Sequence, residues 1–170
     1  ATNNVTVLDD IPVNLTLQAV LERLKLRNDS RRIRDNISEL IEMVTEIARP
    51  KAVYKVSRAG IDSRKTLVID GVEITSYIPT LSFNEDEVVY PYVATCGVEV
   101  EALSIPTSDF MRHFCLNIMK EMVLRAASTH IQTYLTENYA ARPLSRVGPG
   151  EAMGPLTQQI PLFTILGERE

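Results

Sequence analysis

The sequence has few cysteines and no long hydrophobic run. Its two cysteines, Cys96 and Cys115, are too few for a disulfide framework and do not form the close pair that typically binds zinc. No apolar run approaches the roughly 20 residues that a membrane span requires, and the first ten residues, ATNNVTVLDD, lack the pattern of a signal peptide. We therefore expect a soluble, cytoplasmic protein without a membrane partner.

The sequence also lacks a large excess of charge of either sign, since the net charge is only -4. This balance provides no basic field for a phosphate backbone, so nucleic acid is not an expected partner. The charged runs are interpreted as solvated segments, because the basic one is interrupted by acids and no apolar surroundings would raise the pKa of the acidic one. These runs are Arg27, Arg31, Arg32 and Arg34 with Asp29 and Asp35, and Glu85, Asp86 and Glu87.

A length of 170 residues suits one domain with a single core, so the sequence predicts one domain over 1–170. Apolar residues at helical spacing predict a helix over 16–26 and a second one that ends before Pro50. Asn36, followed by Glu39 three residues later, suits the N-cap of that second helix.

The middle of the sequence is typical of strands. AVYKVS and KTLVIDGVEI are rich in β-branched residues, and Asp70-Gly71 is a strong hairpin turn. VVYPYVATCG continues this character, although Pro91 predicts an edge or a break and Gly97 an end.

A long helix is predicted from Ser108, as N-cap, to about Tyr139, because this stretch has no proline or glycine. A short apolar segment, PLFTILG, follows further on. This order predicts an α+β fold with helices on one face of a twisted, mostly antiparallel sheet. The expected apolar stripe of the long helix comprises Phe110, Phe114, Ile118, Met122, Ala126, Ile131, Tyr134 and Leu135.

The soft metal ligands are scattered. His113 and Cys115 are two residues apart on the predicted helix and point to different sides, and His130 lies more than four turns away. With Cys96 they are more simply explained as structural residues than as a metal or thiol site.

The run SRVGPGEAMGPL, residues 145–156, is an unusual loop. Its glycines allow a ligand to approach the main chain, its prolines stiffen the path, and Arg146 suits a carboxylate or phosphate. The spacing matches neither a phosphate-binding loop nor a dinucleotide fingerprint. From these residues alone, a plain surface connector is the better interpretation.

Four segments in order resemble the activation domain of cobalamin-dependent methionine synthase, in its short free-standing form. They are EIARPKAVYKV (46–56), YVATCGVEVEALS (92–104), EMVLRAASTHIQTYLTE (121–137) and ARPLSRVGPGEAMGPLTQQIPLFTILG (141–167). The resemblance implies that the domain binds S-adenosylmethionine and closes over the cobalamin of a partner. One electron from a flavodoxin-like donor and the methyl group of S-adenosylmethionine then restore methylcobalamin.

The signature of that family is an Arg, two residues, then Pro-Gly-Tyr, matched here by Arg146, Gly148, Pro149, Gly150 and Glu151. The resemblance implies that Arg146 binds the carboxylate of the methionine moiety and that the backbone around Gly148 and Gly150 meets the adenosine. Glu151 departs from the tyrosine, replacing an aromatic face by a negative charge.

The early acidic group of the family site has only possible counterparts here, Asp9 and Asp10. Two other functions remain open: a non-catalytic binding or scaffold protein that has kept the fold, and a corrinoid binder outside methionine synthesis.

Overall fold

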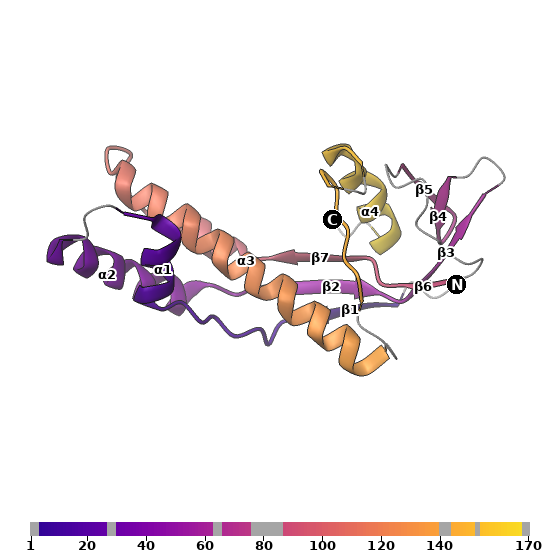
Figure 1. Ribbon diagram of the computed structural model, residues 1–170, viewed down its shortest axis with the longest axis horizontal. Helices are drawn as coiled ribbons and strands as arrows, with labels where there is room; N and C mark the ends of the chain where they lie inside the picture. Colours follow the sequence, from indigo (N-terminus) through magenta and orange to yellow (C-terminus); the bar gives the residue numbers. More distant parts are fainter. Residues whose placement is uncertain are drawn as a thin grey trace. The chain divides into compact units, whose positions relative to one another are not determined.

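The computed structural model describes residues 4–26, 30–62, 66–75, 87–139, 144–151 and 154–167. It shows a mixed α+β fold, as the sequence predicts (Figure 1). The chain divides into two compact units, each built from separate stretches. The helical unit comprises Leu8–Ala52 and Ala94–Thr133, and the sheet unit comprises Ala1–Val7, Val53–Val93 and Tyr134–Glu170.

The helices and strands follow one another along the chain as β1 (Val5–Leu8), α1 (Leu17–Leu24), α2 (Arg31–Ile47), β2 (Lys51–Lys55), β3 (Ser57–Ile61), β4 (Leu67–Ile69), β5 (Val72–Ile74), β6 (Glu87–Val89), β7 (Tyr92–Thr95), η1 (Val98–Ala102), α3 (Phe110–Tyr139), η2 (Leu156–Gln158) and α4 (Gln159–Leu166). None of the helices in the described ranges is both long and apolar enough to cross a bilayer.

The first two helices begin at side-chain caps. Thr16 accepts a hydrogen bond from the backbone N–H of Ala19 and starts α1, which confirms the first predicted helix. Ser30 does the same for Ile33 at the start of α2, so the prediction of Asn36 as N-cap is wrong. Both residues suit a cap, but Asn36 lies within α2 because the helix already begins at Arg31.

The long helix α3 is confirmed, with two corrections. Its first turn is capped by Asp109, whose Oδ1 accepts from the N–H of Arg112 (3.0 Å), and not by Ser108. Ile131 and Leu135 of the expected stripe are buried, but the first part of that stripe lies one position from the buried row, since Phe110 is 81% exposed and Phe114 50%. The buried row runs in steps of four: Cys115, Met119, Val123, Ala127, Ile131 and Leu135. Adjacent rows of this helix are both apolar, so spacing alone does not decide which one is buried.

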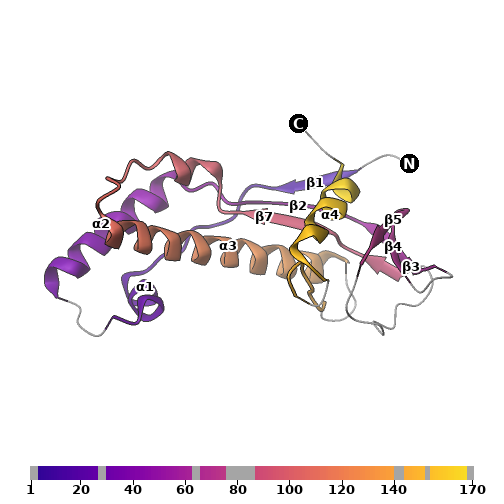
Figure 2. The same cartoon turned by 90° about the horizontal axis from the view of Figure 1, so that it is seen from above.

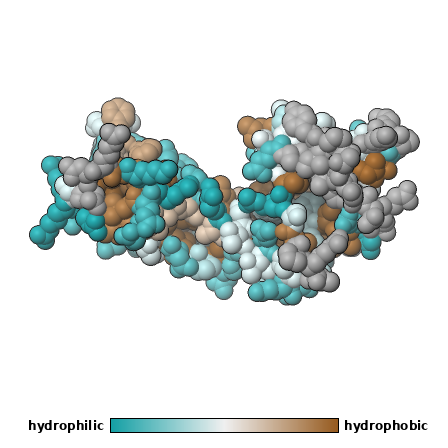
Figure 3. Space-filling view, viewed as in Figure 1, coloured by the Kyte–Doolittle hydropathy of each residue, from teal (hydrophilic) through white to brown (hydrophobic). Residues whose placement is uncertain are grey.

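The core of the helical unit joins α1, α2, η1 and the first part of α3. Figure 3 shows hydrophobic atoms reaching the surface among these helices, between mostly hydrophilic side chains. The buried members of this core are Val20, Leu24, Ile37, Leu40, Val44, Ala48, Val100, Ile105, Cys115, Leu116, Met119 and Val123.

Gly97 lies between β7 and η1, as the sequence predicts for the end of that strand. Its φ is +95°, and a Cβ there would lie 2.7 Å from the carbonyl oxygen of Arg49. Only glycine therefore fits at this close approach of two backbones.

Two sheets are present. Strands β1, β2 and β7 form a three-stranded sheet in that order, and β5, β4, β3 and β6 form a four-stranded sheet. Every pair in the four-stranded sheet is antiparallel, which agrees with the expected sheet type.

The Asp70-Gly71 hairpin is confirmed between β4 and β5. Both residues have positive φ, +51° and +83°, as a two-residue type I′ turn requires. Pro91 separates β6 from β7, so the predicted break is also confirmed.

The segment PLFTILG lies in a helix, α4, which the sequence did not indicate. In Figures 1 and 2, α4 lies beside the β4–β5 hairpin. Its Ile165 packs on the four-stranded sheet with Ala59, Leu67, Ile69 and Ile74, all of which are buried. This cluster is the apolar support of the sheet unit on the side of α4.

Candidate functional site

The loop formed by residues 144–151 lies in the sheet unit, between the end of α3 and the η2–α4 segment. Residues 144–148 belong to no helix or strand, and 149–151 form a turn. Of the five predicted site residues, Arg146, Gly150 and Glu151 are exposed, and Gly148 and Pro149 are half-buried. The fold therefore presents all five together on one short connection.

The turn of this loop is closed by its own backbone. The N–H of Gly150 donates to the carbonyl of Gly154 (2.7 Å), that of Glu151 to Gly148 (3.1 Å), and that of Gly154 to Glu151 (3.2 Å). These three donors are consequently occupied. The N–H groups of Val147 and Gly148, by contrast, make no hydrogen bond to any residue that the structure describes.

Glycine is required where the loop meets the rest of the sheet unit. Gly154 is buried with φ +96°, and a Cβ there would lie 2.7 Å from the carbonyl oxygen of Thr75, which follows β5. Next to it, the N–H of Thr75 donates to Oε1 of Gln158 (2.8 Å). At Gly150, with φ +85°, a Cβ would lie 3.1 Å from Cδ2 of Leu156. Through the hydrogen bond from Gly150 to Gly154, the loop is thus fastened to backbone that lies against the end of β5, and Gly150 itself lies close to Leu156 of η2.

Two opposite charges stand on this fastened loop. Arg146 and Glu151 are both exposed, and neither forms an ion pair with the other or with another described residue. A guanidinium group suits a carboxylate, and a carboxylate suits a cation. With the open N–H groups between them, these charges fit a small zwitterion such as an amino-acid moiety. No aromatic ring lies within residues 144–151 to stack on a base.

The two candidates for the early acidic group of the family site lie in the helical unit and not with the loop. Asp9 and Asp10 are exposed and belong to the helical unit, whereas the loop belongs to the sheet unit. All the residues of the candidate site therefore belong to the sheet unit.

The soft ligands do not form a metal centre in the described part of the chain, where no group of three or more His, Cys, Asp or Glu side chains converges. Cys115 is buried in the helical core, and this burial, followed by the charge of Asp109, raises the pKa of its thiol. A raised pKa leaves less thiolate, the reactive form.

The charged runs of the sequence are only partly described. Arg31 lies 4.0 Å from Asp35 across one turn of α2 and is almost fully exposed, and Arg34 has interactions of its own. Glu87 is in β6. Arg27, Asp29, Glu85 and Asp86 lie outside the described residues.

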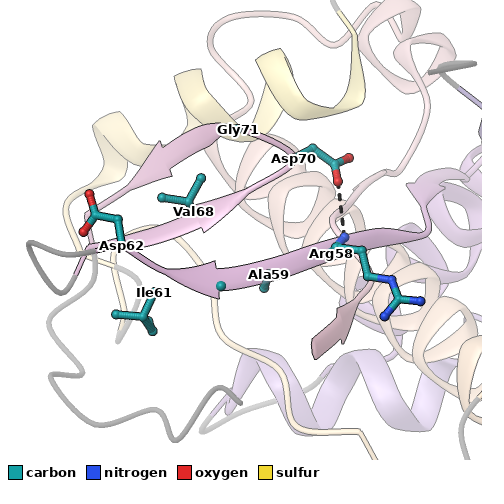
Figure 4. Close-up of a pocket in the computed structure, with 8 residues that line it drawn as sticks. Arg58, Ala59, Ile61, Asp62, Val68, Asp70 and Gly71 are labelled. Carbon is teal, nitrogen blue, oxygen red and sulfur yellow. Dashed lines mark hydrogen bonds between the residues drawn. The ribbon is translucent and has the colours of Figure 1, made fainter. Parts of the chain in front are cut away.

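A shallow hollow of about 440 Å³ lies on the four-stranded sheet, beside β3 and the β4–β5 hairpin (Figure 4). It includes no residue of the loop. Its best-placed polar group, Asp70, is engaged within the fold, and Figure 4 shows this carboxylate turned toward the backbone of Arg58. The carboxylate of Asp70 is therefore not available to bind a ligand in the hollow, and the loop remains the candidate site.

Asp70 ties three elements of the sheet unit together. Its carboxylate accepts from Lys55 Nζ (2.7 Å), the Ser57 hydroxyl (2.9 Å) and the Arg58 N–H (3.2 Å). Lys55 also donates to the carbonyl of Ile165 in the last turn of α4 (3.4 Å). Burial by itself would raise the pKa of Asp70, but the hydrogen bonds and the charge of Lys55 lower it overall.

Four tyrosines form a second polar cluster in the sheet unit. The hydroxyls of Tyr54 and Tyr139 are hydrogen-bonded (2.9 Å), and their ring centres are 6.0 Å apart at a steep angle. Tyr134 and Tyr90 contact these rings with centres 5.9 and 5.8 Å away. Burial, and then the hydrogen bond with Tyr139, raise the pKa of Tyr54 above its usual range.

Sequence reasoning missed Gln158, Thr75, Asp70 as a hub and the tyrosine cluster. The glycine at 154 was noted only for its freedom, and its buried contact with Thr75 spans 79 positions of the sequence. No local pattern signals such a pairing. The nearest available signal was the polar Gln158, three residues after the Gly154-Pro155 pair.

No protein-family model matches the chain, and no curated protein matches it either. The evidence for a function therefore consists of the four sequence segments that resemble the activation domain and the geometry of the loop.

Proposed function

We propose that this protein is an activation-domain-like protein that binds S-adenosylmethionine on the 144–151 loop. It would support reductive methylation of the cobalamin on a methionine synthase or a related corrinoid methyltransferase, in the cytoplasm. The observation that carries the proposal is the exposed Arg146 beside the N–H groups of Val147 and Gly148, which bond no residue of the described ranges, on a loop fastened through Gly150 and Gly154.

Each group of the loop has a task in this proposal. Arg146 would bind the carboxylate of the methionine moiety, and the open N–H groups of Val147 and Gly148 would donate to acceptors of the ligand. The turn at Pro149–Glu151 keeps its own hydrogen bonds, so it shapes the loop instead of donating to the ligand. A fastened loop loses little conformational entropy on binding.

The cobalamin would be carried by a partner and would accept the methyl group once a flavodoxin-like donor has supplied an electron. The contribution of this chain is to hold the sulfonium methyl in line and to exclude water. The free thiols Cys96 and Cys115 are consistent with a reducing compartment.

Calorimetric titration of the full chain with S-adenosylmethionine tests the proposal. We expect saturable binding that is lost or weakened at least tenfold in Arg146→Ala, because the carboxylate loses a charged hydrogen-bond donor. Arg31→Ala is the matched control, since Arg31 is an almost fully exposed arginine of the helical unit. No binding at millimolar ligand, or equal binding by Arg146→Ala, would overturn the site.

One observation favours a second candidate, a scaffold protein that has kept the fold but lost the chemistry. Glu151 stands where the resemblance requires tyrosine, and the described loop has no aromatic ring. Retention of a cobalamin protein on the immobilised chain, with ligand-dependent methylation of its cobalamin, supports the first function. A chain that binds neither S-adenosylmethionine nor a cobalamin protein is the outcome that the scaffold function predicts.

A further inference from the structure

The carboxylate of Glu151, the residue in the place of the family tyrosine, lies beside Gly148. One of its oxygens is 3.9 Å from the position that a Cβ on Gly148 would occupy, and, apart from Gly148 and its two chain neighbours, no other described residue comes within 4 Å of that position. The backbone helps to hold it there, since the N–H of Glu151 donates to the carbonyl of Gly148 (3.1 Å). The glycine at 148 thus leaves open space directly beside a negative charge.

The same loop also carries the opposite charge of Arg146, five positions before Glu151. These two exposed side chains form no ion pair with each other. A ligand with a carboxylate at one end and a second cationic centre further along would be attracted by both groups at once. A ligand with a neutral centre at the second position would be attracted there by neither charge, and only its carboxylate would be attracted by Arg146.

We infer that Glu151 is a specificity-determining residue that selects a sulfonium ligand over the corresponding neutral thioether. The inference rests on the proposed function. S-Adenosylmethionine and S-adenosylhomocysteine share the carboxylate, the ammonium group and the adenosine, and they differ in the methyl group and the charge at sulfur. The charge difference is the property that a carboxylate beside Gly148 can distinguish. Selection of this kind would retain the methyl donor and release the spent product.

The size of the effect follows from the exposure of Glu151. Two unit charges about 4 Å apart in water attract each other enough to change an affinity about fivefold. We therefore expect the wild-type chain to prefer the sulfonium ligand about fivefold. The preference should shrink as salt is added, because exposed charges are screened.

The test is a pair of calorimetric titrations, with S-adenosylmethionine and with S-adenosylhomocysteine, on the wild type and on Glu151→Gln. Glutamine keeps the size of the side chain and removes its charge. We expect the affinity ratio to fall from about five toward one in Glu151→Gln. Glu137→Gln is the matched control, because it removes one negative charge from another exposed glutamate of the sheet unit. Its ratio should equal that of the wild type.

The outcomes separate this inference from the proposed function. If both ligands bind the wild type and Arg146→Ala weakens both equally, the site is supported whatever Glu151 does. A wild-type ratio near one, or a ratio unchanged in Glu151→Gln, then overturns the selection by Glu151 alone. If neither ligand binds the wild type, the proposed function is overturned, and this inference with it.

Discussion

The helical unit and the sheet unit differ in what lies at their centres. The helical unit has a continuous apolar core to which α1, α2, η1 and α3 all contribute. In the sheet unit, an apolar cluster of five buried residues includes Ile165 of α4. The same unit also contains three groups of polar contacts, namely those of Asp70, the tyrosine cluster and the Gln158–Thr75 hydrogen bond. Hydrogen bonds are directional, whereas apolar packing is not.

This difference explains where an exposed binding loop can be held in a defined shape. A loop without a helix or strand of its own needs fixed points, and the sheet unit supplies them at Thr75 and Leu156.

Met119→Ala should remove stability from the helical unit. Met119 is fully buried in the core row of α3, so the deletion should lower the free energy of unfolding by about 2–5 kcal/mol in urea denaturation. Phe110→Ala on the same helix should change it by less than about 0.5 kcal/mol, because that side chain is 81% exposed. Equal losses in both variants would contradict the buried row.

Gly154→Ala should strain the attachment of the loop. Alanine would adopt φ +96° only with difficulty and would place its Cβ 2.7 Å from the Thr75 carbonyl oxygen, so we expect a loss of about 1–3 kcal/mol in the same assay. Gly148→Ala is the control within the loop, with an expected change under about 0.5 kcal/mol, because its Cβ position is open. A silent Gly154→Ala would mean that the loop is not fastened at Thr75.

Asp70→Asn should weaken the polar hub and leave the turn intact, since asparagine also tolerates positive φ. We expect a loss of about 1–2 kcal/mol at pH 7 from the removed ionic hydrogen bond with Lys55. Because folding lowers the pKa of Asp70, its stabilisation is present above the unfolded pKa, near pH 4, and disappears as the pH falls through the folded value.

Urea denaturation of wild type and Asp70→Asn across pH 2–7 checks this prediction. The difference between the two should be constant above about pH 5 and vanish in acid. A difference that grows as the pH falls would have the wrong sign for this hub.

Tyr54→Phe should have the smallest effect, about 0.5–1.5 kcal/mol, because it removes the hydroxyl that is hydrogen-bonded to Tyr139 and keeps the ring contacts with Tyr134 and Tyr139. Tyr92→Phe is the control, since the Tyr92 hydroxyl has no hydrogen bond to a residue in the described ranges. Thermal unfolding compares the two. Equal melting temperatures would show that the hydroxyl pair contributes nothing.

The sequence predicted those features whose causes are local. Asp70-Gly71 determines its own turn, Pro91 breaks a strand by lacking an N–H, and the helix that ends at Tyr139 needs only an absence of breakers. The start of α2 was misplaced because Ser30 and Asn36 are both good caps. Helix α4 was missed because Pro161 and a run of apolar residues obscure its period.

The candidate site was predictable only in part. Its five residues are adjacent in sequence, and the resemblance pointed to them. The residues that fasten them, Thr75 and Gln158, are 83 positions apart, and their pairing depends on the packing of α4 against β5. The position of the Glu151 carboxylate beside Gly148 depends on the turn, in which the Glu151 N–H donates to the Gly148 carbonyl.

A crystal structure of the chain with S-adenosylmethionine would show whether the loop binds this ligand. We expect the ligand on residues 146–151, with its carboxylate on Arg146 and its sulfonium group beside Glu151. Ligand bound elsewhere in the same crystal, for example in the hollow beside Arg58 and Asp70, would contradict it.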